Sequence, residues 1–236
     1  MTSAAAVAYA RAAGVFLILT AAAGWYGELH VPAQMMTGEA ASTAARLRAN
    51  EALFRLGFAA YMVEAISDVT LLWLFYVLLR PVNREFALLS AFFGLVSMTL
   101  FAVTQMFYFA APSFLSERDY FDAFTPEQLE SFASIFLGLS ASLSGLFMLF
   151  YGLAWMVRGW LTFRSRYLPR FLGVAMCVAG LGFFARNATK VLAPQYASDL
   201  LLAPMFLAIV GSGLWLLIVG VSRRKWDEAV ASTASL

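Results

Sequence analysis

Six long apolar blocks constrain this chain more than any other feature of its sequence. They cover residues 10–27, 53–79, 86–111, 129–157, 168–192 and 200–221. A helix needs about 20 apolar residues to cross the hydrocarbon core of a bilayer. Because lipid offers no hydrogen-bond partners, a spanning segment must satisfy its own backbone, as an α-helix does. The alternation of apolar and polar residues that marks a membrane β-barrel is absent. The sequence therefore predicts an all-α transmembrane bundle of about six helices.

Composition narrows the functions that such a bundle can have. The 236 residues are 62% hydrophobic and 13% charged, with a net charge of +2 and no basic stretch interleaved with aromatic residues. We therefore expect no nucleic-acid partner. The chain has one cysteine, Cys177, and one histidine, His30, which together cannot build a Cys/His metal site or a bis-histidine haem. We expect neither a metal nor a cofactor, with Cys177 in the packed core and His30 at the surface.

The distribution of basic residues predicts that both termini are cytoplasmic, since Arg and Lys collect in cytoplasmic loops. Three segments, after the second, fourth and sixth blocks, carry Arg80, Arg84, Arg158, Arg164, Arg166, Arg170, Arg223, Arg224 and Lys225. The loop after the third block is acidic, with Glu117, Asp119, Asp122, Glu127 and Glu130 against Arg118. We therefore predict a multi-pass protein of a bacterial cytoplasmic (inner) membrane, in contact with membrane lipids.

The first block allows two interpretations. Three alanines at 21–23 resemble a signal-peptidase site after a short apolar run. However, the run continues to Trp25 and Tyr26, which suit an anchor at the membrane interface. We expect a retained helix, so that residues 1–222 form one transmembrane helical domain.

The connecting segments contain three local predictions. Residues 38–50 have a helical composition and follow Thr37, which predicts a short surface helix with a threonine cap in the first outer loop. The run Thr125-Pro126-Glu127-Gln128 is a capping box with proline at the first helical position, so the fourth spanning helix should start there. Residues 223–236 are predicted to be a disordered cytoplasmic tail.

Charged residues at membrane depth are costly and mark candidate sites. Glu64 and Asp68 are four residues apart, so they share one face of the second helix. Glu64 and Arg186 are each sixteen residues from an arginine at the inner end of their helices. Both should lie about 24 Å from the cytoplasmic boundary. An ion pair between them is one interpretation, and a polar cavity open to the outside is the other.

Further polar residues fall at the same level. Gln105, Tyr61 and Tyr108 are candidates to line the cavity, with Asn187 beside Arg186 and Arg55 at the outer mouth. Asp68 has no basic residue level with it, which suits either proton coupling or a hydrogen bond to a neighbouring hydroxyl. We assign no catalytic residue.

Three motifs carry a family resemblance. They are Thr43-Ala44-Ala45 with Glu51-Ala52-Leu53-Phe54-Arg55-Leu56-Gly57, then Tyr76-Val77-Leu78-Leu79-Arg80-Pro81-Val82-Asn83, and finally Phe163-Arg164-Ser165 with Leu168-Pro169-Arg170 and Gly173. In order and spacing they resemble a bacterial family of small membrane proteins, domain-of-unknown-function family 4386. The resemblance implies a six-helix bundle without an established activity. Many family members have a histidine near the position of Ser140 and a glutamate near Ser212, which this chain lacks.

These observations leave three functions open. The first is a protein that binds or translocates a small or lipid-like molecule in an outward-facing polar cavity. The second is an accessory or scaffold subunit that packs against a membrane protein partner. The third, which we favour least, is an intramembrane enzyme that uses Glu64 and Asp68 as acid and base.

Overall fold

The predicted all-α bundle is confirmed by a computed structural model, which describes residues 1–116 and 121–234. These residues form helices and connecting turns, with no strand among them. Of the described helices, six are long and apolar enough to cross a membrane, so the chain is a multi-pass membrane protein. The spanning segments are α1 (Ser3–Gly24) with η1 (Trp25–His30) and α2 (Val31–Met35), α4 (Glu51–Leu79), α5 (Arg84–Ala110) with η2 (Ala111–Leu115), α6 (Pro126–Arg164), α7 (Arg170–Leu192), and η5 (Asp199–Leu202) with α8 (Ala203–Ile218). The shorter helices are α3 (Ala40–Ala49), η4 (Pro194–Tyr196) and α9 (Arg223–Ala234).

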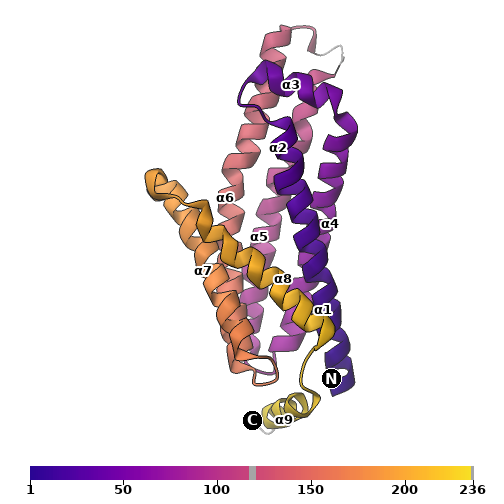
Figure 1. Ribbon diagram of the computed structural model, residues 1–236, viewed down its shortest axis with the longest axis vertical. Coiled ribbons are helices and arrows are strands. Elements are labelled where there is room, and N and C mark those ends of the chain that lie inside the picture. The colour runs from indigo at the N-terminus through magenta and orange to yellow at the C-terminus, as the bar shows by residue number, and fades with distance from the viewer. Residues whose placement is uncertain (117–120, 235–236) are drawn as a thin grey trace.

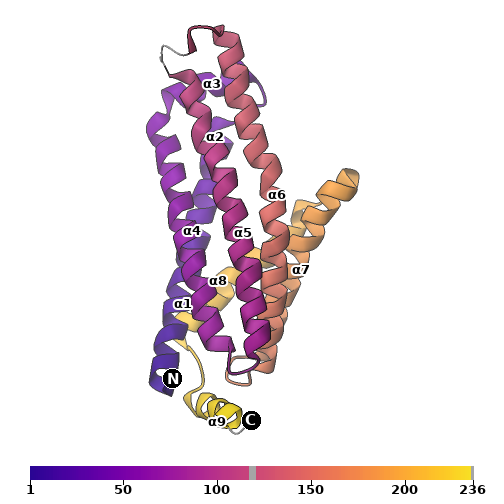
Figure 2. The ribbon, with the colours of Figure 1, turned by 180° about the vertical axis from the view of Figure 1, so that it is seen from behind.

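The six spanning segments are arranged as a closed ring. Neighbours in the ring pack in the order α1, α4, α5, α6, α7, α8 and back to α1. Both termini lie at one end of the bundle, and α3 lies across the opposite end (Figure 1). We call these the termini end and the α3 end. Seen from behind, α4, α5 and α6 stand side by side (Figure 2).

The helices of the ring differ in length. Helix α6 has 39 residues and α7 has 23, which correspond to lengths of about 58 Å and about 35 Å. The pair α7 and α8 leans away from α6 toward the α3 end (Figure 1). The ring is therefore narrow at the termini end and wider toward the α3 end.

Two spans extend furthest beyond the ends that the sequence predicted. The first was predicted over 10–27 and reaches Met35, and the fourth was predicted over 129–157 and covers Pro126–Arg164. The predicted ends fell next to Glu28 and Arg158, because a charged residue lowers the local hydropathy. Both residues instead lie within helices of the ring. The assignment of Arg158 to a cytoplasmic loop was wrong: it is 2% exposed, within α6.

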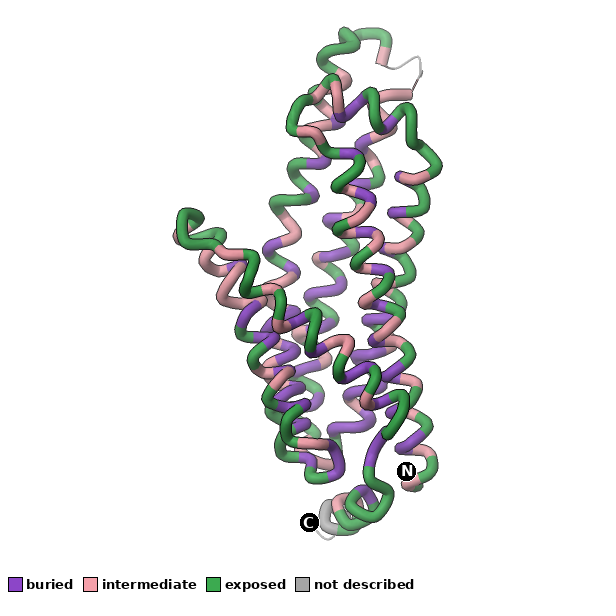
Figure 3. Tube along the Cα trace, viewed as in Figure 1, coloured by how far each residue is buried: buried purple, intermediate pink, exposed green. Residues whose placement is uncertain are grey.

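Small residues bring the helices together near the termini end. A methyl group added to Gly152 of α6 would lie 2.6 Å from the carbonyl oxygen of Gly180 of α7. Gly159 of α6 and Gly173 of α7 face each other in the same way, seven residues nearer the termini end on each helix. A methyl group added to either one would lie 2.7 Å from the carbonyl oxygen of the other. Such contacts between backbones are typical of helices packed in membranes. We call these four residues the glycine seam. Buried residues recur along the helices of this half (Figure 3).

The local predictions for the connecting segments have different outcomes. The capping box of Thr125 and Gln128 forms at the start of α6, as predicted. The short surface helix is also present as α3, but its N-cap is Glu39, without a side-chain cap. The Thr37 hydroxyl instead accepts a hydrogen bond from Glu39 N at 3.4 Å, within the turn before α3. Glu117, Arg118 and Asp119 of the acidic loop lie outside the described residues.

The C-terminal segment differs from the disordered tail that the sequence predicted. Residues 223–234 form α9, while 235–236 lie outside the described residues. Trp226 is 1% exposed, and its ring lies 4.9 Å from that of Tyr167. The Tyr167 hydroxyl donates a hydrogen bond of 2.5 Å to Leu78 O, and burial raises the pKa of this phenol above its usual range. An aromatic anchor of this kind supplies the burial that makes α9 a helix.

Candidate functional site

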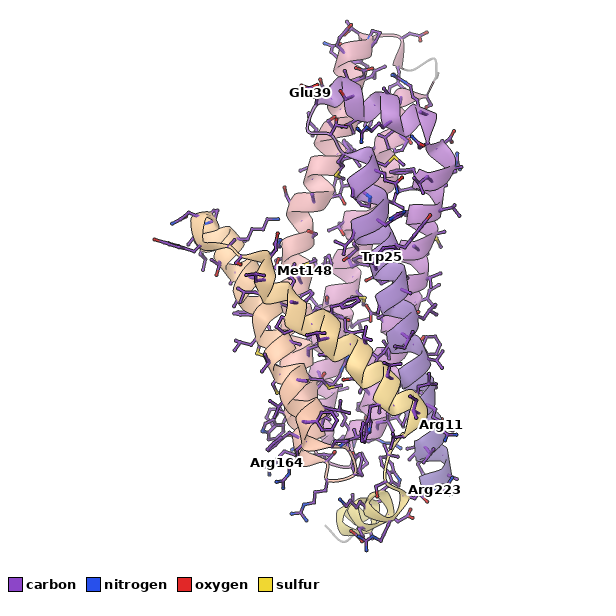
Figure 4. All side chains as sticks on the ribbon, viewed as in Figure 1. Arg11, Trp25, Glu39, Met148, Arg164 and Arg223 are labelled. Carbon is purple, nitrogen blue, oxygen red and sulfur yellow. The ribbon has the colours of Figure 1, made fainter. Side chains whose placement is uncertain are left out.

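The wider half of the ring contains a cavity of about 470 Å³. Its wall is built from η1 and α2 and from parts of α1, α4, α5, α6, α7, η5 and α8. This volume is in the usual range for small-molecule sites, about 300–1,000 Å³. Trp25 and Met148, which both line the cavity, lie at a similar height on either side of the space above α8 (Figure 4). The cavity is therefore placed between α1 and α6, two segments that are not neighbours in the ring.

Three carboxylates line one side of this cavity. Glu64 and Asp68 come from α4, as their spacing predicted, and Glu28 comes from the π-helical turn η1 of the first span. Each interacts electrostatically with another of the three. Gly24 of α1 allows this grouping, because a methyl group there would lie 3.0 Å from Glu64 Oε1. Glu28 is the residue that sequence reasoning missed, since its block appeared to end at Gly27.

Several buried polar atoms of the wall have no hydrogen-bond partner among the described residues. They are Thr20 Oγ1, Glu64 Oε2, Gln105 Oε1 and the Tyr108 hydroxyl. Thr20 and Tyr108 are 3% and 2% exposed, so these hydroxyls are shielded from bulk solvent. Burying a polar group without a hydrogen bond costs about 1–3 kcal/mol. Four such atoms around one cavity are an arrangement that a polar ligand satisfies.

The part of the wall nearest the termini end contains a cluster of polar side chains around Asp68. The Tyr151 hydroxyl donates a hydrogen bond of 3.3 Å to Asp68 Oδ1. The Thr20 hydroxyl lies beside the same carboxylate, at a geometry poorer than a hydrogen bond requires. Arg158 attracts Asp68 electrostatically and lies over the Phe75 ring, 4.4 Å from its centroid. The sequence offered no cation level with Asp68, because Arg158 was placed in a loop.

Arg186 lines the cavity and does not form the ion pair with Glu64 that was one of the two interpretations. Its Nη2 lies 2.7 Å from Asp199 Oδ1 at the start of η5. Asn187 is buried beside the cavity, where it accepts a hydrogen bond from Arg186 Nη1 at 3.0 Å and donates one to Phe183 O at 2.8 Å. The connection between α7 and α8 supplies a nearer carboxylate than α4 does, and sequence alone does not measure that distance.

The remaining predicted residues divide into two groups. Gln105, Tyr61 and Tyr108 line the cavity, as does Ser140. Arg55 does not: it lies on the exposed face of α4 and pairs with Glu51 at 2.7 Å. Arg55 is about two turns beyond Glu64 on α4, which places it outside the cavity wall.

This geometry defines a multi-pass membrane protein whose ring of helices encloses a largely apolar cavity with three carboxylates in its wall. The family model for "Domain of unknown function (DUF4386)" matches residues 12–220, so the chain belongs to that family, as its motifs indicated. An uncharacterized protein from Archaeoglobus fulgidus is 25% identical over 167 residues, which are 71% of this chain and 83% of the archaeal one. No solved structure matches the chain.

Proposed function

We propose that this protein binds a small, lipid-like molecule in its polar cavity. The observation that supports this function is the set of four unpartnered buried polar atoms on the cavity wall. A purely structural cluster would be expected to pair these atoms with one another, as buried polar groups usually are. The glycine seam brings α6 and α7 into backbone contact toward the termini end, so we propose binding rather than passage through the ring.

The rim of the cavity favours access from the membrane. Trp25, Leu29 and Phe206 line the cavity and are 52%, 63% and 53% exposed. Large apolar side chains that are exposed at the mouth of a polar site are compatible with lipid on one side and ligand on the other. A molecule with a polar group and an apolar body suits this combination.

We further propose that the α3 end faces the outside of a cytoplasmic membrane. Arg164 and Arg223 are labelled at the termini end and Glu39 at the α3 end (Figure 4). An excess of Arg at the cytoplasmic side is the general rule for membrane proteins, and it favours this orientation. The cavity then opens toward the outer half of the bilayer.

Native mass spectrometry of the purified protein tests the binding function. We expect a co-purified molecule in the wild type that is lost from Ala21→Phe, because Ala21 lines the cavity and the larger ring would fill it. Ala22→Phe is the matched control, since Ala22 is exposed on the same helix and is not part of the cavity wall.

Two other results would point elsewhere. Retention of a protein subunit by both variants, with no small molecule in the wild type, favours an accessory or scaffold role. A chemically altered molecule from the wild type, with the unaltered one retained by Glu64→Gln, favours an intramembrane enzyme.

A further inference from the structure

We infer that the ligand is an organic cation with an apolar body, held by Glu28 and Glu64 and by aromatic faces. This inference rests on the proposed binding function and names the chemical class of the ligand. It starts from an imbalance of charge. Glu28 and Glu64 line the cavity, and neither has an ion-pair partner among the described residues.

The cations near the cavity do not offset the excess of carboxylates in its wall. Arg186 is engaged by Asp199 at 2.7 Å, on the side of the cavity formed by α7 and η5. Arg158 is not part of the cavity wall and acts on Asp68 and Tyr151 from the side of the termini end. Lys190 lines the cavity near the α3 end of α7, is exposed, and has no ion-pair partner among the described residues. Among the described residues of the wall, Glu28, Glu64 and Asp68 therefore outnumber the one cation that no carboxylate engages, Lys190, and this excess of acidic groups favours a cationic ligand.

The aromatic side chains favour an organic cation over a polar neutral molecule. Aromatic rings contributed by the first span and by α4, α5 and α6 line the cavity, and they are Trp25, Tyr61, Phe101, Tyr108, Phe147 and Tyr151. The face of such a ring attracts a cation, and carboxylates beside aromatic rings are the usual surroundings of quaternary ammonium groups. The unpartnered hydroxyls of Thr20 and Tyr108, both almost fully buried, point to a ligand at this same wall.

A metal ion fits this site poorly. Among residues 1–116 and 121–234, no three His, Cys, Asp or Glu side chains lie close enough to hold one. Divalent ions such as calcium need six or more oxygen ligands at about 2.4 Å. A cation whose charge is spread over several carbon atoms does not need such a shell and can contact separated carboxylates and rings together.

The test uses two probes of the same shape and opposite charge, the tetraphenylphosphonium cation and the tetraphenylborate anion. Binding is measured by equilibrium dialysis against the full chain in a non-ionic detergent. We expect the cation to bind more tightly than the anion. Glu28→Gln and Glu64→Gln should each weaken cation binding by about tenfold. Glu51→Gln, on the exposed face of α4, should leave it unchanged.

The outcomes separate this inference from the proposed function. Equal or tighter binding of the anion, no binding of the cation, or wild-type affinity in both Gln variants overturns the organic cation. If Ala21→Phe still abolishes binding of the anion or of a co-purified molecule in that case, the binding function stands. If Ala21→Phe changes neither probe nor any co-purified molecule, both proposals fail.

Discussion

The two halves of the ring differ in how their buried polar atoms are accommodated. In the half near the termini end, the Ser90 hydroxyl of α5 is satisfied by Ala154 O of α6 at 2.9 Å, although Trp155 Nε1 and Arg158 Nε of the same half have no hydrogen-bond partner among the described residues. In the half near the α3 end, buried acceptors and hydroxyls on α1, α4 and α5 have no such partner and line a cavity. Hydrogen bonds between helices stabilise their packing, whereas unpartnered atoms in a cavity wall are free to accept or donate a hydrogen bond to a ligand.

The difference arises from residue size at helix contacts. Where glycine seam residues meet, α6 and α7 touch through their backbones, and α1 and α8 do so at Gly14 and Gly213. Nearer the α3 end α7 and α8 diverge from the longer helices (Figure 1). If this comparison is correct, substitutions near the termini end should reduce stability, and substitutions around the cavity should change binding more than stability.

The largest expected effect is at the glycine seam. Gly180→Leu would place a side chain against the carbonyl oxygen of Gly152 at 2.5 Å and the backbone nitrogen of Met156 at 2.7 Å. Because two backbones must separate, we expect a loss of about 3 kcal/mol in stability or failure to assemble. Thermal unfolding in detergent measures this. Gly138→Leu is the control, since a side chain there meets no neighbouring atom within 4 Å. Equal midpoints for the two variants would contradict the role of the seam.

The next largest loss of stability is expected for the buried charges of Asp68 and Arg158, which lie between the two halves of the ring. Asp68→Asn and Arg158→Met should each destabilise the fold by about 2 kcal/mol, because each leaves the other charge uncompensated. The double variant should recover about 1 kcal/mol of the summed loss. A double-mutant cycle by chemical denaturation measures this coupling. The exposed pair Glu51 and Arg55 is the control, and we expect its coupling to stay below about 0.5 kcal/mol. Additive losses at Asp68 and Arg158 would show that the two charges act independently.

A smaller effect is expected where α9 and the turn before α7 close the termini end. Tyr167→Phe removes the hydrogen bond to Leu78 O and should cost about 1 kcal/mol. Burial raises the pKa of Tyr167 in the folded state, so its contribution is complete below the unfolded pKa and is lost as pH rises toward the folded one. The stability difference between wild type and variant should therefore shrink above about pH 10.

Thermal midpoints measured from neutral to alkaline pH test the role of Tyr167. Tyr196→Phe, at an exposed ring, serves as the control for tyrosine loss. A difference between wild type and Tyr167→Phe that grows above pH 10 would be the wrong sign.

The smallest effect on stability is expected at the α3 end of the cavity. Asp199→Ala breaks the ion pair with Arg186, whose carboxylate partner is 81% exposed, so the loss of stability should stay below about 1 kcal/mol.

Asp199→Ala should also change binding, because it frees Arg186 to interact with a ligand in the cavity. We expect cation binding to weaken by about threefold and anion binding to strengthen. Equilibrium dialysis of both probes measures this, with Glu51→Ala as a control pair outside the cavity. Unchanged preference between the probes would contradict the idea that Arg186 is held out of the site by Asp199.

Sequence patterns determined much of one wall of the site. The spacing of Glu64 and Asp68 puts both on one face of α4, and this face lines the cavity together with Gln105 and Tyr108 of α5. Helical periodicity and rise are local properties of the chain, so a sequence pattern can place residues of one helix on a common face. The partner of Arg186, the place of Arg55 and the conformation of the C-terminal segment depend on distances between distant parts of the chain, which the sequence pattern does not give.

By itself, the sequence determined that this chain is a bundle of six apolar helices, because lipid leaves the backbone no alternative. Only the tertiary structure decided which charges lie inside the ring. Glu28 and Arg158 stand at the edges of their apolar blocks, where hydropathy does not distinguish a loop from a helix turned inward. The pairing of Arg186 with Asp199 likewise follows from how α7 and α8 meet. The free energy of burying a charged side chain depends on the groups around it, and these groups come together only when the helices pack.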